Sequence, residues 1–383
     1  MGGYALKRAV QTTCVLVLIS VLFLALLLSG SVLASAPPQD DSVIYRGRIL
    51  DVAPIEPQPY DEDSWENQII TVHLLSGPHQ GETIQILHTL TGHPYYDLVV
   101  KEGDRVVLEA DFSGTEPEYF LSDFSRKTPL AVITILFILS IVFIGGRQGV
   151  KAVISLVGMG IVILTMILPL VLRGHNPIVV TVGLSSVLTG LFILLVAGYS
   201  KKTAAAVCGT VGGLVTAGIL AYISGKASYL TGLASSEAQM LQYMDSSIDF
   251  QGLLFSGMII GALGAILDVG ISIASAMEQI KEADPTTDFK TLFSRGILVG
   301  RDLIATMSNT LILAYVGSSL PLLLLFQASQ SSWSEVLNLD MVASEIIRAM
   351  TGSIGLTLAI PITALVSALL LVKPQDKGQD LGN

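Results

Sequence analysis

Hydrophobic and polar positions follow two different patterns along the chain. Between residues 41 and 124, short stretches such as Val43–Leu50 and Gln68–Leu75 alternate apolar and polar side chains, which is the period of a half-buried β-strand. From residue 129 onwards the apolar stretches are about 20 residues long, the length of a helix that crosses the hydrocarbon of a bilayer. The pattern therefore predicts a small β-domain followed by a membrane-spanning helical domain.

Turn-forming residues separate the alternating stretches of the first region. Gly77 and Pro78 follow one stretch and Gly81 precedes the next, and glycine and proline both favour turns. Five or so short strands in about 80 residues suit a small all-β barrel or sandwich of the OB or lipoyl-like type. We assign this β-domain to residues 41–124.

The residue types that bind metals are scattered rather than grouped. Four of the five histidines fall in the β-domain, at His73, His79, His88 and His93. Histidines spread over strands and turns in this way are typically structural or solvated. The two cysteines, Cys14 and Cys208, lie in apolar stretches, so neither a disulfide framework nor a thiolate site is expected. The sequence predicts no metal and no other cofactor.

The apolar stretches of the second region predict seven transmembrane helices. They cover residues 129–145, 152–172, 177–198, 203–224, 251–275, 302–326 and 350–372. Hydrophobic residues make up 51% of the chain and charged residues 14%, which is far from the composition of a soluble domain. The expected fold is a polytopic α-helical membrane protein, with its helical domain at residues 129–373 and a small extracytoplasmic all-β domain.

Basic residues in the short connections are distributed asymmetrically. One side of the membrane receives Arg147, Lys151, Lys201, Lys202, Lys281, Lys290, Arg295, Lys373 and Lys377. The short connections of the other side carry only Arg173 and Lys226. Because cytoplasmic loops are enriched in Lys and Arg, the first side is predicted to be cytoplasmic. The tail of residues 374–383 is then cytoplasmic, and residues 41–124 are extracytoplasmic.

The first 36 residues have the layout of a secretory signal. Lys7 and Arg8 precede an apolar stretch, Cys14–Leu28, and Ala34-Ser35-Ala36 follows it. Pro37 directly after this motif disfavours cleavage, so residues 1–36 are either a signal peptide or an uncleaved signal anchor. Both alternatives export the β-domain, in agreement with the charge asymmetry.

The net charge of −10 belongs mainly to the exported domain. Between Asp40 and Lys127 there are 17 acidic and 6 basic residues, whereas the acids and bases of the remaining chain nearly cancel. An acidic surface disfavours nucleic acid and anionic lipid headgroups as partners. The expected partners are therefore the lipid bilayer, a small-molecule or ion substrate, a protein bound by residues 41–124, and a second copy of the chain.

A carboxylate interrupts the fifth apolar stretch on a face of small residues. The stripe consists of Gly257, Gly261, Gly264, Asp268, Ser272 and Ser275, at steps of three or four. Small residues let another helix approach closely, so the glycines are predicted to pack and Asp268 to face protein. An ionisable group at the centre of a membrane costs about 2.5–3.5 kcal/mol and is a functional candidate. We therefore expect Asp268, with Ser272 one turn away, to couple transport to an ion.

Further charged groups stand at the start of the last two spans. Arg301 and Asp302 begin the sixth span, and Asn309 follows two turns later with a neutral oxygen, so these three join the ion-coupling candidates. Glu345 and Arg348, one helical turn apart before the seventh span, are secondary candidates. The structural alternatives are that Arg301 extends to the headgroups and that Glu345 and Arg348 form a surface pair of little energetic value.

Two prolines predict interruptions in the last spans. The apolar stretch from residue 296 to 326 is longer than a bilayer core, and it contains Gly317 and Pro321, where a helix can break. Pro361 offers a second break in the last span. Interrupted helices near charged residues are the means by which many transporters build substrate and ion sites.

Three segments of the sequence resemble the YibE/F-like family of bacterial integral membrane proteins. They are GALGAILDVGISIASAMEQI, GRDLIATMSNTLILAYVGSSLPLLLL and EIIRAMTGSIGLTLAIPITALV, which begin at Gly261, Gly300 and Glu345. The resemblance extends over nearly the whole chain. It implies a multi-pass protein of the bacterial plasma membrane, of a family described as related to permeases or efflux, and it brings no assigned substrate or catalytic residue.

Three classes of function compete for such a chain. The first is a transporter or export permease, coupled to an ion gradient through the intramembrane acids Asp268 and Asp302. The second is a non-catalytic scaffold or accessory subunit of a transport system, whose β-domain contacts partners. The third, an intramembrane enzyme, is disfavoured because the chain lacks HExxH, GxSxG and GxxxxGK[ST] motifs, so no catalytic residue is assigned. Acids on stripes of small residues favour the transporter.

Overall fold

The computed structural model describes residues 43–54, 66–93, 97–112, 117–329 and 332–372. The expected signal segment, residues 1–36, and the expected tail, residues 374–383, lie outside the described residues. The chain divides into two compact units, with the boundary between Ile144 and Gly145.

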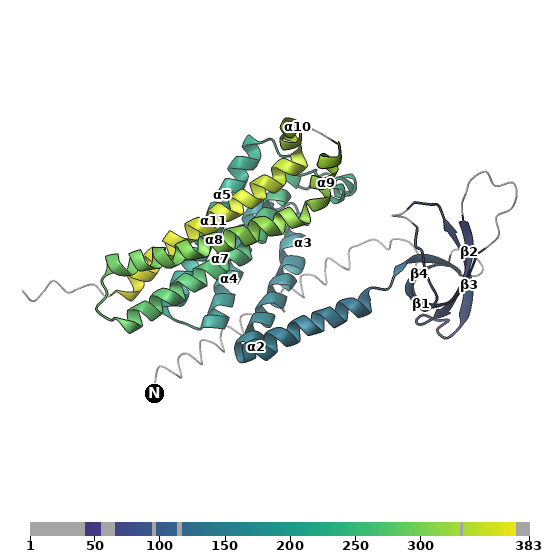
Figure 1. Ribbon diagram of the computed structural model, residues 1–383, viewed down its shortest axis with the longest axis horizontal. Helices are drawn as coiled ribbons and strands as arrows, with labels where there is room; N and C mark the ends of the chain where they lie inside the picture. The colour runs from purple at the N-terminus through teal and green to yellow at the C-terminus, as the bar shows by residue number, and fades with distance from the viewer. Residues whose placement is uncertain (1–42, 55–65, 94–96, 113–116, 330–331, 373–383) are drawn as a thin grey trace, which may run out of the picture. The chain divides into compact units, whose positions relative to one another are not determined.

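The first unit is an antiparallel β half-barrel (Figure 1). Its strands are β1 (Val43–Pro54), β2 (Glu66–Leu74), β3 (Thr83–Leu90), β4 (Arg105–Asp111) and β5 (Glu118–Phe124). They are hydrogen-bonded in the order β3-β2-β1-β4-β5, so β1 lies at the centre while β3 and β5 form the two edges. The expectation of a small all-β domain is confirmed.

The alternation read from the sequence sets the inner face of this sheet. In β1 the side chains of Tyr45 and Ile49 are buried, whereas Ile44 and Leu50 are exposed. The inner face of the sheet is completed by residues of the neighbouring strands, among them Ile70, Val72, Leu74, Ile86, Val106, Leu108 and Ala110. Full burial of one such Val, Leu or Ile side chain stabilises the fold by about 1.5–3 kcal/mol.

The second unit is helical. Its elements, with the helix that leads into it, are α2 (Lys127–Val162), the π-helical turn η1 (Ile163–Ile167), α3 (Leu168–Leu172), α4 (Pro177–Ala197), α5 (Lys201–Ala227), α6 (Ser236–Met244), α7 (Phe250–Ala283), α8 (Phe289–Ser318), α9 (Leu320–Ser329), α10 (Trp333–Asn338) and α11 (Asp340–Leu371). Within the described residues, six helical runs are long and apolar enough to cross a membrane. The chain is therefore a membrane-embedded helical protein with an N-terminal β half-barrel.

The expected count of seven spans differs from this number at one place. The stretches 129–145 and 152–172 belong to a single helical run of 46 residues, Lys127–Leu172. Inside this run the backbone of Gly146 leaves the helical conformation, with φ 52° and ψ −129°. Glycine adopts such a positive φ without the steric penalty that a Cβ atom brings.

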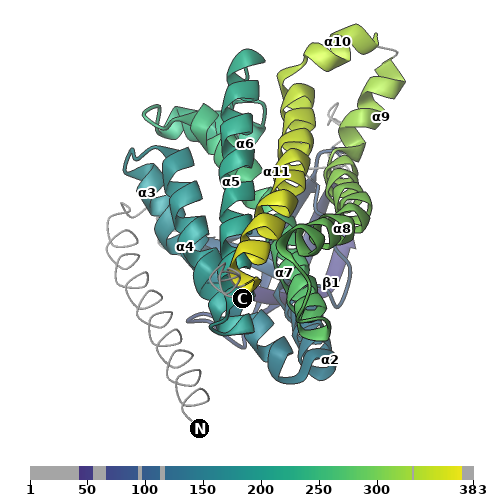
Figure 2. The same cartoon turned by 90° about the vertical axis from the view of Figure 1, so that its left-hand side faces the viewer.

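Three helices form the centre of the second unit. The helices α5, α7 and α11 pack against one another, with α4 against α5 and α7, and α8 against α7 and α11 (Figure 2). The central cluster contains Ala217 of α5, Ile266 and Ile273 of α7, and Leu356 and Ile360 of α11, all of them buried. These positions recur at helical spacing, so each helix presents one apolar face to the others.

Side-chain caps fix where several of these helices begin. The Oδ1 atom of Asn176 accepts hydrogen bonds from the backbone N–H groups of Ile178 and Val179, both at 3.1 Å, at the start of α4. Asp249 caps α7 in the same manner, through a 2.9 Å hydrogen bond from the backbone of Gly252. Such caps satisfy N–H groups that a helix start leaves without a partner.

The two expected interruptions have different outcomes. The sixth span changes helix where Gly317 and Pro321 predicted it, because α8 ends at Ser318 and α9 begins at Leu320. The expectation for Pro361 is wrong, because α11 continues through it as one helix. Ala359 and Ile360 beside this proline are buried against the other central helices, and this packing maintains the helix without the missing hydrogen bond.

Candidate functional site

The stripe of small residues lies on the exposed side of α7. Gly257, Gly261, Gly264, Asp268 and Ser272 are all exposed in the single chain. A Cβ atom added at Gly257 or Gly264 would meet nothing within 4 Å. The expectation that these two glycines pack inside the bundle is therefore not met by the chain alone, whereas Gly261 does approach Tyr315 of α8 closely.

The bundle instead uses the opposite face of α7. Ile259, Ile266 and Ile273 on that face are fully buried. Large apolar side chains gain more from burial than glycines do, so they decide which of the two faces turns inward. Asp268 consequently faces out of the bundle, and Ser272, which is also exposed, lies one turn away on the same side.

The candidates on α8 also face away from the bundle. Gly296 and Gly300 are buried on the inner side of this helix, whereas Arg301, Asp302 and Asn309 are exposed. In the part of the chain that the structure describes, no hydrogen bond or ion pair joins Asp268 to these three residues.

Asp268 and Asp302 nevertheless lie at a similar depth. The helices α7 and α8 are antiparallel neighbours, and two contacts define their register. A Cβ atom at Gly261 would lie 2.7 Å from the Tyr315 hydroxyl, and one at Gly296 would lie 2.5 Å from Met277 Sδ. If residues are counted along both helices from these two contacts, Asp268 is level with residues 305–308 of α8. Asp302 is therefore about one to two helical turns away in depth.

The structure brings the two secondary candidates together with a tyrosine. Arg348 Nη1 donates to Glu345 Oε1 at 2.9 Å, and both side chains are about three-quarters buried. The Arg348 guanidinium carbon lies 6.0 Å from the centre of the Tyr315 ring, at the limit of a cation–π contact. The cluster therefore joins α8 to α11.

Three polar atoms of this cluster are buried without a partner. They are the Tyr315 hydroxyl, the second carboxylate oxygen of Glu345 and the Nε atom of Arg348, none of which has a hydrogen-bond partner among the described residues. Leaving a buried polar group unpaired costs about 1–3 kcal/mol, and more when the group is charged. Such a cluster is suited to a polar ligand that supplies the missing hydrogen bonds.

A cavity of about 230 Å³ adjoins the cluster. It is lined by Tyr315, Ser319 and Glu345 and otherwise by apolar side chains of α8, α9, α10 and α11, including Ile312, Leu322, Trp333, Val336, Leu337, Val342 and Met350. A mostly apolar wall with a few convergent polar groups is the usual composition of a ligand site. The volume is below the range of drug-sized pockets, so it fits a small ligand.

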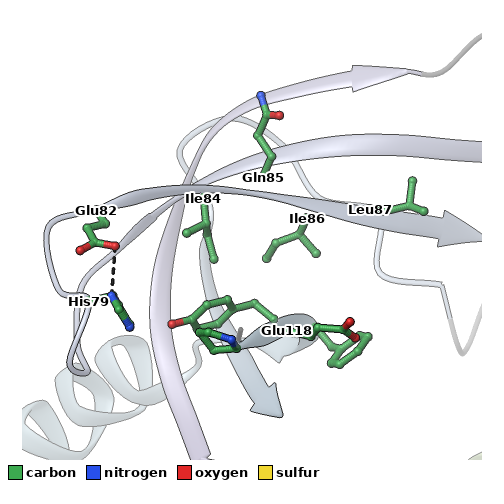
Figure 3. A pocket seen from close by; sticks show the side chains of 10 residues that line it. His79, Glu82, Ile84, Gln85, Ile86, Leu87 and Glu118 are labelled. Carbon is green, nitrogen blue, oxygen red and sulfur yellow. Dashed lines mark hydrogen bonds and ion pairs between the residues drawn. The ribbon is translucent and has the colours of Figure 1, made fainter. Parts of the chain in front are cut away.

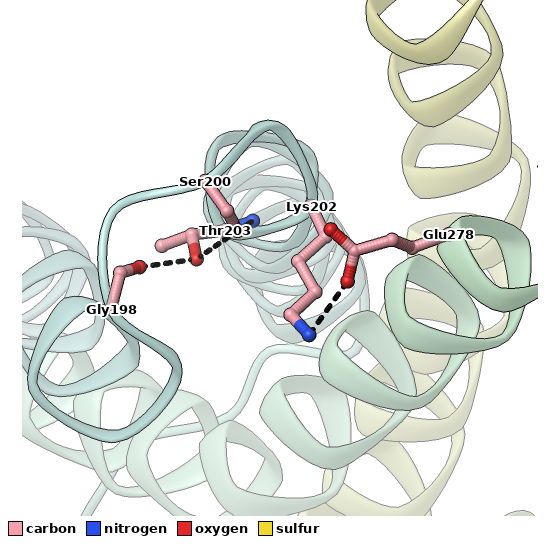
Figure 4. A network of polar contacts seen from close by, with 5 residues as sticks. All are labelled: Gly198, Ser200, Lys202, Thr203 and Glu278. Atoms are coloured by element: carbon pink, nitrogen blue, oxygen red, sulfur yellow. Dashed lines mark hydrogen bonds and ion pairs between the residues drawn. The ribbon is translucent and has the colours of Figure 1, made fainter. Parts of the chain in front are cut away.

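A second polar network lies where α5 begins and α7 ends (Figure 4). Lys202 Nζ lies 2.7 Å from Glu278 Oε2, and both side chains are more than two-thirds buried. Beside them the Thr203 hydroxyl donates to the carbonyl oxygen of Gly198 at 2.6 Å, and Ser200 contacts the same hydroxyl at 3.0 Å. The pair of Lys202 and Glu278 connects the start of α5 with the last turns of α7.

The sequence did not predict Tyr315, Lys202 or Glu278 as parts of a site. Lys202 and Glu278 belong to different spans, so no local spacing connects them. The available signal was that both lie on the predicted cytoplasmic side with opposite charge. Tyr315 gave a weaker signal, as a hydroxyl-bearing aromatic residue inside an apolar stretch.

The β half-barrel has a cleft of its own between its two edge strands (Figure 3). Its volume is about 570 Å³, and its lining includes Ile84 and Ile86 of β3 and Glu118 of β5. Ile84 and Ile86 point from β3 toward the strand that carries Glu118. At the mouth, His79 Nδ1 lies 3.1 Å from Glu82 Oε2. The edges of β3 and β5 are not hydrogen-bonded to each other, so the barrel is open here.

The four histidines of this unit do not converge. His88 Nε2 contacts the carbonyl oxygen of Leu98 at 3.0 Å, while His79 contacts Glu82. Within the described parts of the chain, no three histidine, cysteine or carboxylate side chains lie close enough together to hold a metal ion.

Comparison with known families covers both units. Residues 133–373 match the family model described as YibE/F-like protein, and residues 47–121 match the one described as YibE/F family N-terminal domain. No curated protein and no solved structure was found to match the chain.

Proposed function

The chain belongs to the YibE/F-like family, and we propose that it is a membrane transporter or export permease driven by an ion gradient. The observation that carries the proposal is the cluster of Tyr315, Glu345 and Arg348, whose buried polar atoms have no partner beside a mostly apolar cavity. These atoms are buried within the protein, so a ligand that supplies their missing hydrogen bonds is bound strongly. A structural ion pair would need neither the cavity nor the unpaired atoms.

In this proposal the substrate is small and has an apolar body with one polar end. The apolar body lies against the walls of α8 and α11, and the polar end bonds to Glu345 and Tyr315. The coupling ion binds deeper in the membrane, at Asp268 of α7. Asp302 of α8 lies at a similar level but on the side of its helix that faces away from α7, so it does not share this ion. Asp268 bears the exchangeable charge, and Ser272, one turn away on the same face of α7, is a neutral oxygen ligand near it.

The proposed topology has seven spans. A helical run of 46 residues is about 69 Å long, more than twice the hydrocarbon thickness of a bilayer. We therefore divide Lys127–Leu172 at Gly146 into two crossings. The β half-barrel is then extracytoplasmic and the end of α11 cytoplasmic, in the plasma membrane of a bacterium. The cavity lies toward the extracytoplasmic side, and the pair of Lys202 with Glu278 lies at the cytoplasmic end.

Reconstitution of the full chain tests this function. Liposomes with an imposed pH or sodium gradient are supplied with an isotope-labelled extract of small metabolites, and the internal contents are compared with and without the gradient. We expect at least one component to accumulate or to be expelled only when the gradient is present. If no component moves in response to either gradient, the transporter proposal is wrong.

Two matched pairs of variants test whether Asp268 and Glu345 take part in transport. Asp268→Asn preserves the shape and removes the titratable charge, so we expect gradient-dependent movement to be abolished. Asp284→Asn, the same change in the connection after α7, should leave it intact. Glu345→Gln should weaken the apparent affinity for the transported component about tenfold, and the exposed Glu282→Gln should not. Full activity of both test variants would remove these residues from the mechanism.

A second candidate function rests on the open edge of the β half-barrel. We propose, as the alternative, a non-catalytic accessory or scaffold subunit whose β-domain holds a partner protein. Among the described residues, no further strand pairs with the outer edges of β3 and β5 on either side of the cleft, and an extended segment can pair with such an edge. A photo-crosslinking residue at Leu87, exposed on the edge strand β3, should then capture a protein that one at Leu50, exposed on the central strand β1, does not. Transport by the purified chain alone would favour the first function over this one.

A further inference from the structure

The outer face of α8 contains two polar side chains, Asp302 and Asn309, although the helix is long enough to cross the membrane. This face consists of Leu298, Asp302, Ala305, Asn309 and Val316, all exposed in the single chain. Their steps of four, three, four and seven residues follow a heptad pattern, which forms a straight seam along one side of a helix. The opposite side of α8 packs on α7 and α11, at the edge of the bundle (Figure 2).

This face is unsuited to lipid. Asp302 and Asn309 are 13 and 20 residues into a helix of 30 residues, so Asn309 is about 30 Å along the helix from its start. Neither side chain has a hydrogen bond or ion pair with any other described residue. Carboxylate and amide groups at such positions face protein rather than hydrocarbon, because lipid offers them no hydrogen-bond partner.

We infer that this face of α8 is the interface of a homodimer, in which the α8 helices of two chains run parallel about a twofold axis along the membrane normal. The inference goes beyond the proposed function and does not depend on transport.

The chemistry of the face is complementary to itself. Residues on a twofold axis meet their own copies, and the Asn309 amide can pair with a second Asn309 because it both donates and accepts. Single asparagines at the corresponding positions of coiled coils specify dimers and their register. Asp302 lies one heptad before Asn309 and therefore also meets its own copy, which places two carboxylates together. Arg301 stands beside it at the edge of the face, so the arginine of each chain can reach the aspartate of the other and neutralise this repulsion.

Other occupants fit this face less well. The helical residues 128–144 of the same chain contain no carboxylate, amide or cation. Of their three hydroxyl groups, those of Thr134 and Ser140 donate to the helix backbone, and that of Thr128 accepts from Arg105 of the β half-barrel. A helix of this composition leaves Asp302 and Asn309 without partners, whereas a second copy of α8 satisfies both.

Disulfide crosslinking in native membranes locates the interface. In a full-length chain with Cys14 and Cys208 replaced by serine, we introduce Leu298→Cys or Ala305→Cys on the face. The matched control is Thr310→Cys, which is exposed on the same helix but turned about 100° from Asn309. Both test variants should form a covalent dimer on oxidation, and the control should remain largely monomeric.

Three outcomes of this experiment would overturn the inference. Equal crosslinking at all three positions would indicate random collision. Protection of Ala305→Cys from a small maleimide without formation of a dimer would show that another part of the same chain covers the face. Crosslinking of the test positions to a different protein would assign the face to that partner.

A charge exchange tests the proposed pairing independently. Arg301→Asp alone and Asp302→Arg alone each place like charges across the interface, so the dimer dissociation constant in detergent should rise at least about tenfold. The double variant restores opposite charges and should recover the dimer. Asn309→Leu should weaken the dimer as well, while Thr310→Leu should not. If mass measurements show the same oligomeric state for all these variants, the inference fails.

Discussion

Gly213 of α5 and Gly355 of α11 face each other so closely that a Cβ atom on either would lie 2.8 Å from the carbonyl oxygen of the other. The two helices therefore meet backbone to backbone at the centre of the bundle. The space next to them is filled by Ala217 and Ala359, which are also small and buried. This crossing fixes the spacing of the helices on which the other elements pack.

Substitution at this crossing should destabilise the protein. Gly355→Ala forces its methyl group against backbone rather than against a flexible side chain, so we expect a loss of about 1–3 kcal/mol in the free energy of unfolding. Gly264→Ala on the exposed side of α7 is the control, because nothing lies within 4 Å of its Cβ position. It should be neutral or stabilising, since alanine favours helix. Thermal unfolding in detergent measures both, and equal effects would contradict the close approach.

The sequence predicted the elements better than it predicted their faces. The alternation of Val43–Leu50 and the length of the apolar stretches follow from local periodicity. The small all-β domain is confirmed, and the described residues contain six helical runs long and apolar enough to cross a membrane where seven spans were expected. On the predicted stripe of α7, Gly261 does lie against another helix, at Tyr315 of α8, whereas Gly264 and Asp268 are turned outward. Periodicity reveals that a helix has two faces, and it does not decide which face a neighbouring helix covers when both contain small residues.

The candidate site shows the same limit. The spacing of Glu345 and Arg348 predicted a pair on one helix face, and the structure has the ion pair. The contribution of Tyr315 and the cavity beside it depend on how α8 and α9 pack against α11, which no local pattern encodes. The pairing of Lys202 with Glu278 is long-range for the same reason.

The ion pair between Lys202 and Glu278 should couple α5 to α7 energetically. The two side chains are mostly buried at 2.7 Å, so Lys202→Met and Glu278→Gln should each destabilise the protein, and the double variant should lose less than the sum. We expect a coupling energy of about 1 kcal/mol from a double-mutant cycle in detergent. As the control, a cycle of Lys202→Met with the exposed Glu282→Gln should give a coupling energy near zero. A coupling energy near zero for Lys202→Met with Glu278→Gln as well would mean that solvent screens the ion pair.

The turn between α7 and α8 should be sensitive to acid. Hydrogen bonds from the Thr286 hydroxyl, and then from Thr287 and the Thr286 backbone, hold the pKa of Asp284 below its ordinary value of 3.8. Because the folded-state pKa is depressed, this stabilisation is fully present above the pKa of the unfolded chain. It is lost as the pH falls through the lower folded-state value.

The comparison of two proteins isolates this effect. Between pH 5 and pH 3 the unfolding temperature of the unmodified protein should fall further than that of Asp284→Asn, which has no carboxyl group to titrate at this position. Thermal scans in the same detergent at both pH values provide the measurement. Identical falls in temperature would show that the Asp284 turn contributes nothing to acid stability.

Whether Lys127–Leu172 is divided at Gly146 into two crossings determines on which side of the membrane every later connection lies. With seven spans, the connection after α3 is extracytoplasmic and the one after α7 is cytoplasmic. With six spans both assignments reverse, and Lys281, Lys290 and Arg295 would lie outside, against the usual enrichment of cytoplasmic loops in basic residues. We therefore expect the seven-span arrangement.

Single cysteines in a background without Cys14 and Cys208 distinguish the two arrangements. In intact cells a membrane-impermeant maleimide should label Glu102→Cys in the β half-barrel and His175→Cys in the connection after α3. It should label Glu282→Cys only after permeabilisation. All three side chains are exposed in the structure, so a difference in labelling reports the side of the membrane rather than burial. Labelling of Glu282→Cys but not of His175→Cys in intact cells would establish a single crossing between Lys127 and Leu172.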